Sequence, residues 1–231
     1  MFDGRWRSSI EAGLRPVGSG IRRTGIRADH VTAAGIVVAA AAAVAIGAGA
    51  LRGGLLLLIV AGLCDFLDGA IAKASGITNS KRGAFFDSVS DRLTDALLLG
   101  GVAYYLADTR GGTIAVLPMA VLGAASLVSY QRAKAESLGF DARGGLMERA
   151  ERFIVLGFGL LFNELIVAVL WVMLVLTAVT AVQRFVKVWR QAERPEPQPL
   201  PEWRPSRTRR RSARPVSQVW RERAARSRRP R

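Results

Sequence analysis

Cysteine and histidine are almost absent from this sequence. Its 231 residues include one cysteine, Cys64, and one histidine, His30. A single cysteine excludes an intramolecular disulfide and a metal site made of several cysteines. The sequence also lacks the short charged start of a signal peptide, because 30 residues with six arginines precede its first apolar block. We therefore expect no cleavable signal.

Apolar residues, by contrast, are abundant and occur in long blocks. Half of the residues are hydrophobic. Six blocks approach or reach the roughly 20 residues that cross a bilayer core, at residues 31–51, 53–72, 84–107, 113–130, 153–163 and 165–186. This pattern predicts an all-α integral membrane protein with six transmembrane helices.

Lysine and arginine are concentrated on one side of the predicted spans. They are frequent before residue 28, between the second and third blocks, and between the fourth and fifth, whereas the opposite connections hold only Arg52 and Arg110. Because cytoplasmic loops of membrane proteins are enriched in these residues, both termini should be cytoplasmic. Within residues 1–28, arginines mix with apolar residues at spacings of three and four, which indicates an amphipathic helix lying in the membrane interface.

Residues 187–231 form a basic tail that we expect to be disordered. They carry 15 of the 33 Lys and Arg residues and seven of the nine prolines. Proline breaks helices, and a segment this charged has too few apolar residues to form a core. Such a tail beside a membrane should bind anionic lipid headgroups. Nucleic acid is the alternative ligand, with Trp203 and Trp220 stacking on bases, but lipid already accounts for the charge and we do not expect nucleic-acid binding.

Two pairs of aspartates adjoin apolar blocks. Asp65 and Asp68 occur in CDFLDGAIAK, at the end of the second block, and Asp87 and Asp91 occur near the start of the third. Residues three or four apart share one face of a helix. The two blocks are joined by a short loop, so the helices should be antiparallel neighbours whose carboxylates meet.

Four carboxylates at membrane depth need a positive counter-charge. Arg92 is the nearest arginine and too few others share that depth, so we predict divalent metal. All-oxygen ligands without His or Cys favour Mg²⁺ or Mn²⁺ over zinc. Two ions bridged by the carboxylates would clamp a diphosphate. An ion path across the membrane is the alternative explanation of such aspartates.

Small and basic residues flank these aspartates. Gly69 lacks a Cβ and would let a phosphorylated ligand approach the helix backbone. Ala72 keeps the next turn small, Lys73 supplies a cation, and Gly83 repeats the small residue one turn before the second pair. Close helix packing is the alternative explanation of each glycine on its own.

These residues together resemble the signature of the CDP-alcohol phosphatidyltransferases, integral membrane enzymes with six spans. The matching arrangement is Asp65-x2-Asp68-Gly69-x2-Ala72-Lys73-x9-Gly83-x3-Asp87-x3-Asp91, within a resemblance that covers residues 29–186. The family pattern has arginine at the position of Lys73 and one residue fewer before the second glycine. The resemblance implies that the four aspartates hold two Mg²⁺ ions, with Mn²⁺ as a substitute, and that Asp91 also accepts a proton.

The resemblance also implies which residues receive the CDP group of CDP-diacylglycerol. These are Asp29, His30, Val31, Thr32, Gly69, Ala72, Lys73, Ser80 and Gly83. The first four match the family's Asp-x-x-Thr motif at the start of the first span. Asp29 and Thr32 are also ordinary helix N-cap residues, and His30 alone fits a polar residue at headgroup level.

Three arginines, Arg132, Arg149 and Arg152, occur in SYQRAKAESLGF (129–140) and GGLMERAERF (144–153). Such a cluster suits a phosphorylated alcohol, because arginine binds phosphate through paired N–H donors. The alternative is the ordinary cytoplasmic excess of arginine, with Glu148 and Glu151 pairing locally on the helix.

Both stretches resemble actinobacterial phosphatidylinositol phosphate synthases, a branch of the same family whose acceptor is inositol phosphate, and Arg184 matches a basic position there. The resemblance implies a homodimer in a bacterial plasma membrane, with a cytoplasmic active site. Within the family, phosphatidylglycerol phosphate synthase is the alternative. Outside it, an intramembrane prenyltransferase usually has more spans and lacks the glycine spacing, and an ion transporter would place its carboxylates within the spans.

Overall fold

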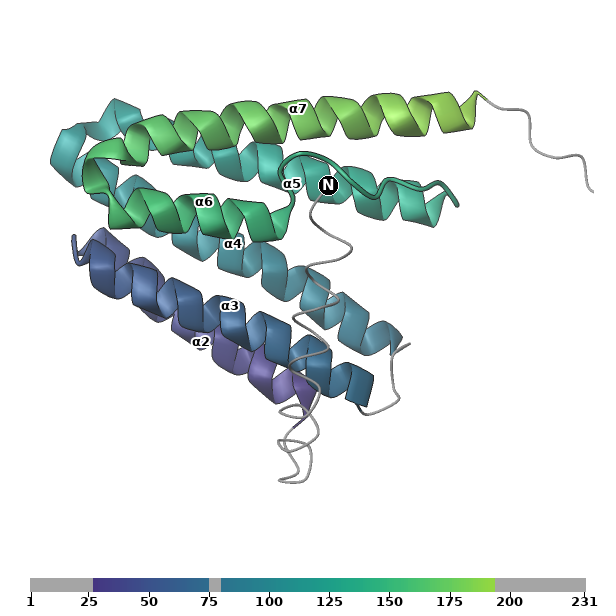
Figure 1. Ribbon diagram of the computed structural model, residues 1–231, viewed down its shortest axis with the longest axis horizontal. Coiled ribbons are helices and arrows are strands. Elements are labelled where there is room, and N and C mark those ends of the chain that lie inside the picture. The colour runs from purple at the N-terminus through teal and green to yellow at the C-terminus, as the bar shows by residue number, and fades with distance from the viewer. Residues whose placement is uncertain (1–26, 75–79, 194–231) are drawn as a thin grey trace, which may run out of the picture. The chain divides into compact units, whose positions relative to one another are not determined.

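The computed structural model describes residues 27–74 and 80–193, and all regular structure in these ranges is helical. The long helices are α2 (Ala28–Gly47), α3 (Leu51–Ala74), α4 (Lys81–Arg110), α5 (Val116–Ser137), α6 (Arg149–Leu161) and α7 (Ile166–Ala192). Two short 3-10 helices, η1 (Gly112–Ala115) and η2 (Asn163–Leu165), precede α5 and α7 (Figure 1). The all-α prediction is confirmed for these residues. The predicted interfacial helix before residue 27 and the tail beyond residue 193 lie outside the described residues.

The structure distinguishes the helices by their capacity to cross a bilayer. Four in the described ranges are long and apolar enough: α2, α3, α5 together with η1, and α7 together with η2. Helix α4 has 30 residues but carries three aspartates in its first half. Helix α6 has 13 residues, which at 1.5 Å per residue gives about 20 Å, less than the roughly 30 Å of a hydrocarbon core. The described residues form six long helices, as predicted, but only four of these qualify as spans on their own.

Two helix boundaries differ from the sequence prediction. Helix α7 continues to Ala192, so residues 187–192, which the sequence analysis assigned to the disordered tail, are helical. The N-cap of α2 is Arg27, so neither Asp29 nor Thr32 caps this helix. Ser80 does cap α4, because its Oγ accepts the backbone N–H of Gly83 at 3.2 Å.

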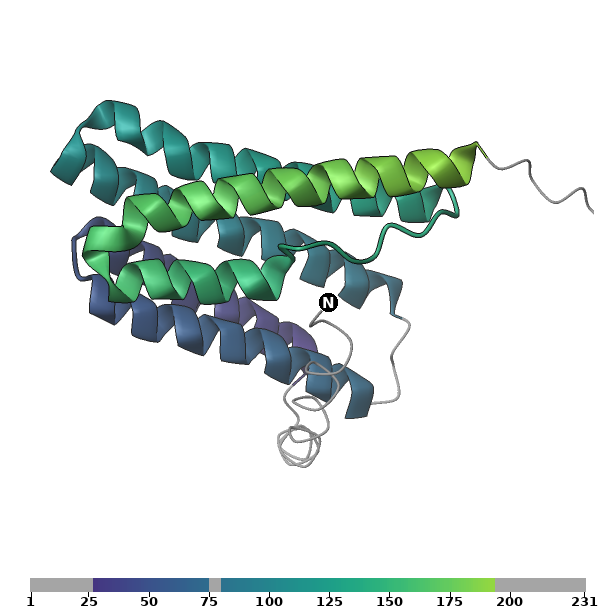
Figure 2. The same cartoon turned by 45° about the horizontal axis from the view of Figure 1, so that its top comes forward.

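The six helices pack as a closed ring. Helix α2 contacts α3 and α4, α3 contacts α6, α6 contacts α7, α7 contacts α5, and α5 returns to α4. Each helix runs antiparallel to the one before it (Figures 1 and 2). The backbones of α2 and α4 touch, since a Cβ on Gly101 would lie 2.5 Å from the carbonyl oxygen of Ala43. A larger residue there would push the two helices apart.

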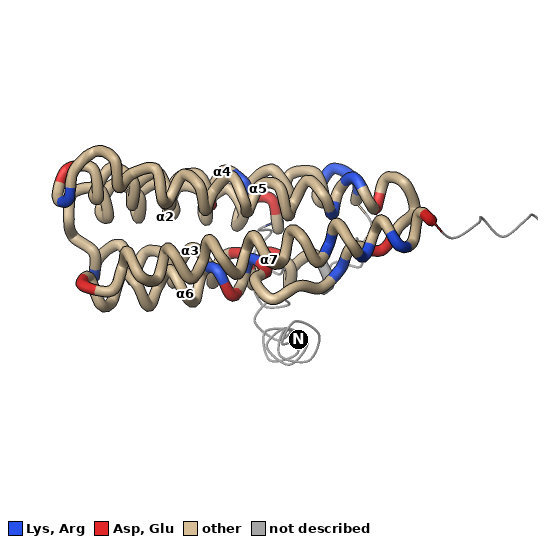
Figure 3. The backbone as a smooth tube through the Cα atoms, turned by 90° about the horizontal axis from the view of Figure 1, so that it is seen from above, with Lys and Arg blue, Asp and Glu red and all other residues tan. Residues whose placement is uncertain are grey.

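The two halves of this ring differ in chemistry. Around the connections α2–α3, α4–α5 and α6–α7 the interior is apolar, with fully buried side chains that include Ile46, Leu98, Leu106, Leu160, Ile166 and Leu170. Toward the end where α3, α5 and α7 finish, buried charged side chains replace them: Asp68, Asp95, Arg152 and Arg184. Figure 3 shows Lys and Arg gathered toward this second end. The apolar half therefore holds the helices together and the charged half offers the chemistry.

Candidate active site

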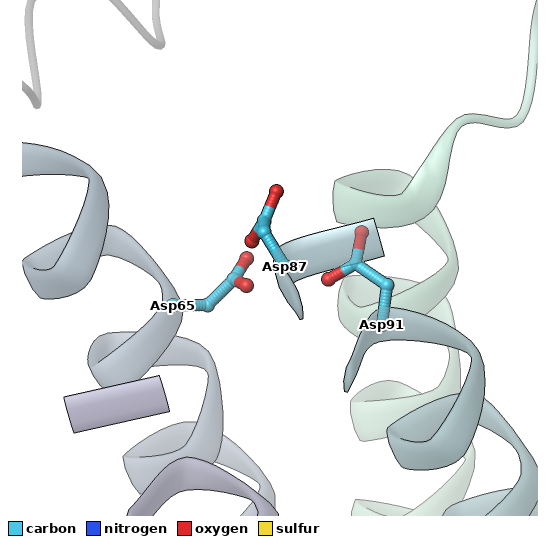
Figure 4. A group of neighbouring side chains, drawn as sticks. All are labelled: Asp65, Asp87 and Asp91. Atoms are coloured by element: carbon cyan, nitrogen blue, oxygen red, sulfur yellow. The ribbon is translucent and has the colours of Figure 1, made fainter. Parts of the chain in front are cut away.

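Three of the four predicted aspartates meet between α3 and α4. Asp65 of α3 and Asp87 and Asp91 of α4 each offer a carboxylate oxygen, and these oxygens lie within 4.8 Å of one another. Figure 4 shows the three side chains converging from the two helices. Asp87 is exposed, whereas the other two are half-buried. Antiparallel packing of α3 and α4 around α2 thus brings together residues that the sequence separates by 26 positions.

The fourth aspartate, Asp68, lies outside this group of three. Its side chain is buried, and its Oδ2 accepts a hydrogen bond from the Thr32 hydroxyl at 2.5 Å. Thr32 belongs to α2, so the bond ties the first described helix to the aspartates of α3. The Asp-x-x-Thr motif and the aspartate motif are therefore in direct contact through their side chains.

Arg149, the first residue of α6, reaches into the aspartate group. Its Nη1 lies 2.7 Å from Oδ1 of Asp65 and also contacts Oδ1 of Asp91. Its guanidinium stacks over the ring of Phe153, one turn further along α6, with 5.0 Å from Cζ to the ring centroid. The prediction that Arg92 is the closest cation is wrong. Nη1 of Arg92 stays 3.8 Å from Oδ2 of Asp91.

Arg152 makes a buried ion pair one turn deeper. Its Nη2 donates to Oδ2 of Asp95 at 2.8 Å, and the two side chains are 5% and 6% exposed. Nε of Arg149 lies 3.9 Å from the other oxygen of Asp95. From the aspartate group toward the interior of the ring, the charged groups therefore alternate in sign: the guanidinium of Arg149, the carboxylate of Asp95 and the guanidinium of Arg152. Such alternation offsets the cost of burying each charge alone.

Arg184 and Arg132, the other two arginines predicted to bind the acceptor, have different surroundings. Arg184 is buried and all three of its nitrogens donate: Nε to the Gly144 carbonyl at 3.0 Å, Nη1 to the Val128 carbonyl at 3.0 Å, and Nη2 to Oε1 of Glu148 at 2.7 Å. Arg132 is exposed and pairs along α5 with Glu136 at 3.0 Å. Glu148 therefore pairs with Arg184 of α7, and it also caps the start of α6 together with Glu151.

The segment between α5 and α6 runs back along α7 before α6 begins (Figure 2). Four α7 side chains, at positions three or four apart on one face, bind it in succession. Gln191 donates to the Asp141 carbonyl at 2.6 Å and Lys187 to Oδ2 of Asp141 at 2.8 Å. Arg184 then binds Gly144, as above, and the hydroxyl of Thr180 accepts the backbone N–H groups of Leu146 and Met147 at 3.2 and 2.9 Å.

These contacts determine where α6 starts. Gly145 has φ +151°, and a Cβ there would collide with the side chain of Thr180, so only glycine fits. At the outer end of the segment, the hydrogen bond from Lys187 and then the N–H of Arg143 lower the pKa of Asp141 below its ordinary value. This arrangement was not predicted from the sequence. The spacing of Thr180, Arg184, Lys187 and Gln191 was the available signal, but the last two lie in the segment that was predicted to be a disordered tail.

The residues predicted to receive the nucleotide lie at the same end of the ring. Asp29 is 3.6 Å from Nη2 of Arg82, and Nδ1 of the exposed His30 accepts the backbone N–H of Arg27 at 3.5 Å. Val31 and Ala72 are half-buried. No described atom lies within 4 Å of a Cβ built on Gly69, so helix packing does not account for this glycine. The side chain of Lys73 is outside the described part of the structure.

The aspartate group has the donors that a hard divalent cation requires. Asp65, Asp87 and Asp91 supply carboxylate oxygens with no His or Cys among them. Such donors suit Mg²⁺, Mn²⁺ or Ca²⁺ and not zinc. The residues therefore fit a metal ion, provided that the guanidinium of Arg149 leaves the oxygens it now contacts.

Comparison with known proteins assigns this arrangement to a family. The family described as CDP-alcohol phosphatidyltransferase matches residues 26–189. The chain belongs to the CDP-alcohol phosphatidyltransferase family. It is thus a multi-pass membrane transferase of phospholipid biosynthesis, and the resemblance noted in the sequence is confirmed. The intramembrane prenyltransferase and the ion transporter are excluded by this finding.

Named relatives include enzymes of archaea and actinobacteria. The chain is 37% identical over 175 residues to archaetidylinositol phosphate synthase of Methanothermobacter thermautotrophicus, covering 73% of this chain and 86% of the relative. It is 33% identical over 179 residues to phosphatidylinositol phosphate synthase of Mycobacteroides abscessus, covering 73% and 80%.

Solved structures of a related enzyme show the same fold. The phosphatidylinositol phosphate synthase of Mycobacterium tuberculosis, crystallised with CDP-DAG bound, superposes with a TM-score of 0.70 at 28% identity, over 76% of this chain and 93% of that one. The same enzyme in complex with manganese and citrate also gives a TM-score of 0.70 at 28% identity, over 76% and 88%.

Proposed function

We propose that this chain transfers the phosphatidyl group of CDP-diacylglycerol to inositol phosphate, forming phosphatidylinositol phosphate and releasing CMP. A hydroxyl oxygen of the acceptor forms a bond to the phosphorus that carries the diacylglycerol, and the bond from that phosphorus to CMP breaks. The observation that carries the proposal is the meeting of the carboxylates of α3 and α4 with the arginines that open α6. The names of the relatives in archaea and actinobacteria support the acceptor.

The aspartates have two tasks in this proposal. Asp65, Asp68, Asp87 and Asp91 hold two Mg²⁺ ions, for which Mn²⁺ can substitute. When bound, the ions supply positive charge against the diphosphate and the departing CMP. Asp91 accepts the proton of the attacking hydroxyl, since a carboxylate kept ionised beside positive charge is a suitable base near neutral pH.

CDP-diacylglycerol, the donor, lies beside the start of α2, the end of α3 and the start of α4. Asp29, His30, Val31 and Thr32 border the nucleotide from α2. Gly69, Ala72, Lys73, Ser80 and Gly83 border it from the other two helices. The open space beside Gly69 supports this assignment, because a ligand can approach the α3 backbone there. Thr32 contributes indirectly as well, by holding Asp68.

The acceptor phosphate lies at the start of α6. Arg149 is the first residue of that helix, where backbone N–H groups and the helix dipole favour an anion. Arg132, exposed at the end of α5, is a second contact. Arg152 and Arg184, whose donors bind Asp95 and Glu148, contribute by fixing the start of α6.

The membrane arrangement follows from the charge distribution. All six helices are embedded, with both termini and the active site on the cytoplasmic face of a bacterial plasma membrane. Supporting this orientation, Lys and Arg gather toward the end of the ring where α3, α5 and α7 finish (Figure 3). A homodimer is the proposed assembly, by analogy with the family.

Replacing Arg132 by Gln should raise the KM for inositol phosphate while leaving the KM for CDP-diacylglycerol nearly unchanged. The loss of one charge-assisted contact to phosphate corresponds to about ten- to a hundredfold in kcat/KM. Release of CMP by purified protein with Mg²⁺ measures both constants. The matched control is Arg190→Gln, which removes an exposed arginine near the end of α7 and should alter neither.

The acceptor itself is tested by supplying inositol phosphate, glycerol 3-phosphate, free inositol and serine side by side. Inositol phosphate should react best. If free inositol or serine reacts equally well, the phosphate site is refuted. If glycerol 3-phosphate is preferred, the phosphate site stands and the enzyme is a phosphatidylglycerol phosphate synthase.

Truncation after Glu193 should leave activity in detergent within about twofold of the full chain. The removed residues contribute charge that acts at a lipid surface and is screened by salt. CMP release by both forms in the same detergent provides the measurement. A large loss would mean that the tail takes part in the site or in assembly.

A further inference from the structure

One cation already occupies the place where a metal ion would bind. Nη1 of Arg149 contacts an oxygen of Asp65 and an oxygen of Asp91, two of the three carboxylates in the aspartate group. A guanidinium at this position supplies positive charge to the same two carboxylates that a divalent ion would need, and electrostatic repulsion opposes placing both cations there. The described structure therefore holds its aspartates in a form neutralised by the chain itself.

The backbone at Arg149 is fixed on both sides. The residue before it, Glu148, pairs with buried Arg184 at 2.7 Å, and Arg152, three residues later, pairs with buried Asp95 at 2.8 Å. The preceding segment is bound along α7 through Thr180. The Arg149 side chain, by contrast, is 20% exposed and turns about several single bonds. Rotation about these bonds would take the guanidinium off the aspartates while the backbone of α6 stays in place.

We propose that Arg149 is a tethered cation that competes with divalent metal for Asp65 and Asp91. Metal binding displaces the guanidinium, which remains at the N-terminus of α6 and becomes available to the phosphate of the acceptor. The inference rests on the metal site of the proposed function. It adds an order to that function: the arginine that binds the acceptor is released only after metal has bound.

Competition between Arg149 and the metal ion has measurable consequences for metal affinity and for the stability of the metal-free fold. Metal must replace contacts between a guanidinium and two carboxylates, so the apparent affinity for metal is lowered by about ten- to a hundredfold relative to a chain without the arginine. Without metal, the same contacts compensate carboxylates that would otherwise repel one another. Loss of Arg149 should therefore weaken the metal-free fold and strengthen metal binding.

Arg92 is the natural control for simple charge repulsion. It also lies beside Asp91, but at 3.8 Å from Oδ2 and with a 37% exposed side chain. Replacing either arginine by Gln removes one positive charge near the aspartates. Only the Arg149 change removes a group that contacts two of the three carboxylates.

The first measurement is Mn²⁺ affinity by calorimetry on the full chain in detergent, for the wild type, Arg149→Gln and Arg92→Gln. We expect Arg149→Gln to bind Mn²⁺ about ten- to a hundredfold more tightly than the wild type, and Arg92→Gln to differ by less than about threefold. Equal gains in both variants would reduce the effect to charge repulsion and overturn the proposal. Unchanged affinity in Arg149→Gln overturns it as well.

The second measurement is the melting temperature of the same proteins in EDTA and in saturating Mn²⁺. Arg149→Gln should melt below the wild type in EDTA and at or above it in Mn²⁺, because metal replaces the lost charge. A variant that is less stable in both conditions would indicate a purely structural arginine and contradict competition. Should Arg149→Gln fail to fold in EDTA, Arg149→Lys serves instead, with a smaller gain in Mn²⁺ affinity expected. Absence of Mn²⁺ binding in the wild type and in every variant would refute the metal site itself.

Discussion

Replacing Asp91 by Asn is expected to lower the turnover number by about 10²- to 10⁴-fold, the range in which positioned acid–base groups contribute. Asparagine keeps the shape of the side chain but cannot accept the proton of the acceptor hydroxyl, and it is a weaker metal ligand. The fold should survive, because Arg149 keeps its contact with Asp65 and one repelling charge is removed. The loss should therefore be in kcat and not in the amount of folded protein.

CMP release from CDP-diacylglycerol, with and without the acceptor, measures this effect, and gel filtration checks the fold. The matched control is Asp108→Asn, which makes the same chemical change at an exposed position near the far end of the same helix. That control should retain the activity of the wild type. Near wild-type turnover in Asp91→Asn would remove Asp91 from the role of proton acceptor.

Local patterns in the sequence predicted the helices and the meeting of Asp65 with Asp87 and Asp91. A long apolar block inside a bilayer must form a helix, because only a helix satisfies the backbone hydrogen bonds within a single segment. Aspartates three or four positions apart necessarily share a helix face. A short connection predicts antiparallel α3 and α4; in the structure both pack on α2, and their carboxylates still meet. Each of these steps depends on residues close together in the sequence.

The partner of these aspartates could not be found in this way. Arg149 is 58 positions beyond Asp91, and it reaches the group because α6 packs against α3 and so helps to close the ring. That contact depends on how six helices pack together, which no local spacing specifies. The same holds for Thr32 and Asp68, which were assigned to separate motifs and share one hydrogen bond.

Helix α6 also differs from the predicted fifth span, with a consequence for the site. Residues 153–163 were read as a span of their own, whereas α6 begins at Arg149 and ends at Leu161. The segment before α6 runs back along α7, so α6 starts beside the aspartates of α3 and α4 and not at the C-terminal end of α7. If α6 started near the end of α7, its arginines would only add to the positive charge of the cytoplasmic loops. The short helix thus brings Arg149 and Arg152 to carboxylates inside the ring.

Replacing Arg152 by Met is expected to destabilise the fold by about 3–5 kcal/mol, because buried Asp95 would lose its 2.8 Å partner and keep only the 3.9 Å approach of Arg149. Asp95→Leu alone should be destabilising for the complementary reason. The double variant Arg152→Met, Asp95→Leu removes both charges and should recover most of the stability, since an apolar pair often replaces a buried ion pair at little cost. The free energy of unfolding is measured in the same detergent for the wild type, the two single variants and the double variant. The four values give the coupling energy between the two residues.

Burial, and not the ion pair as such, should account for the size of this effect. The comparison is Arg132→Met, which breaks a pair of 3.0 Å between side chains that are 45% and 48% exposed. It should cost less than about 1 kcal/mol, because water screens exposed pairs. A similar loss in Arg132→Met and Arg152→Met, or a double variant no more stable than Arg152→Met, would contradict the assignment. In that case the Arg152–Asp95 pair would not be what holds α6 against α4, and another contact would have to position Arg149 beside the aspartates.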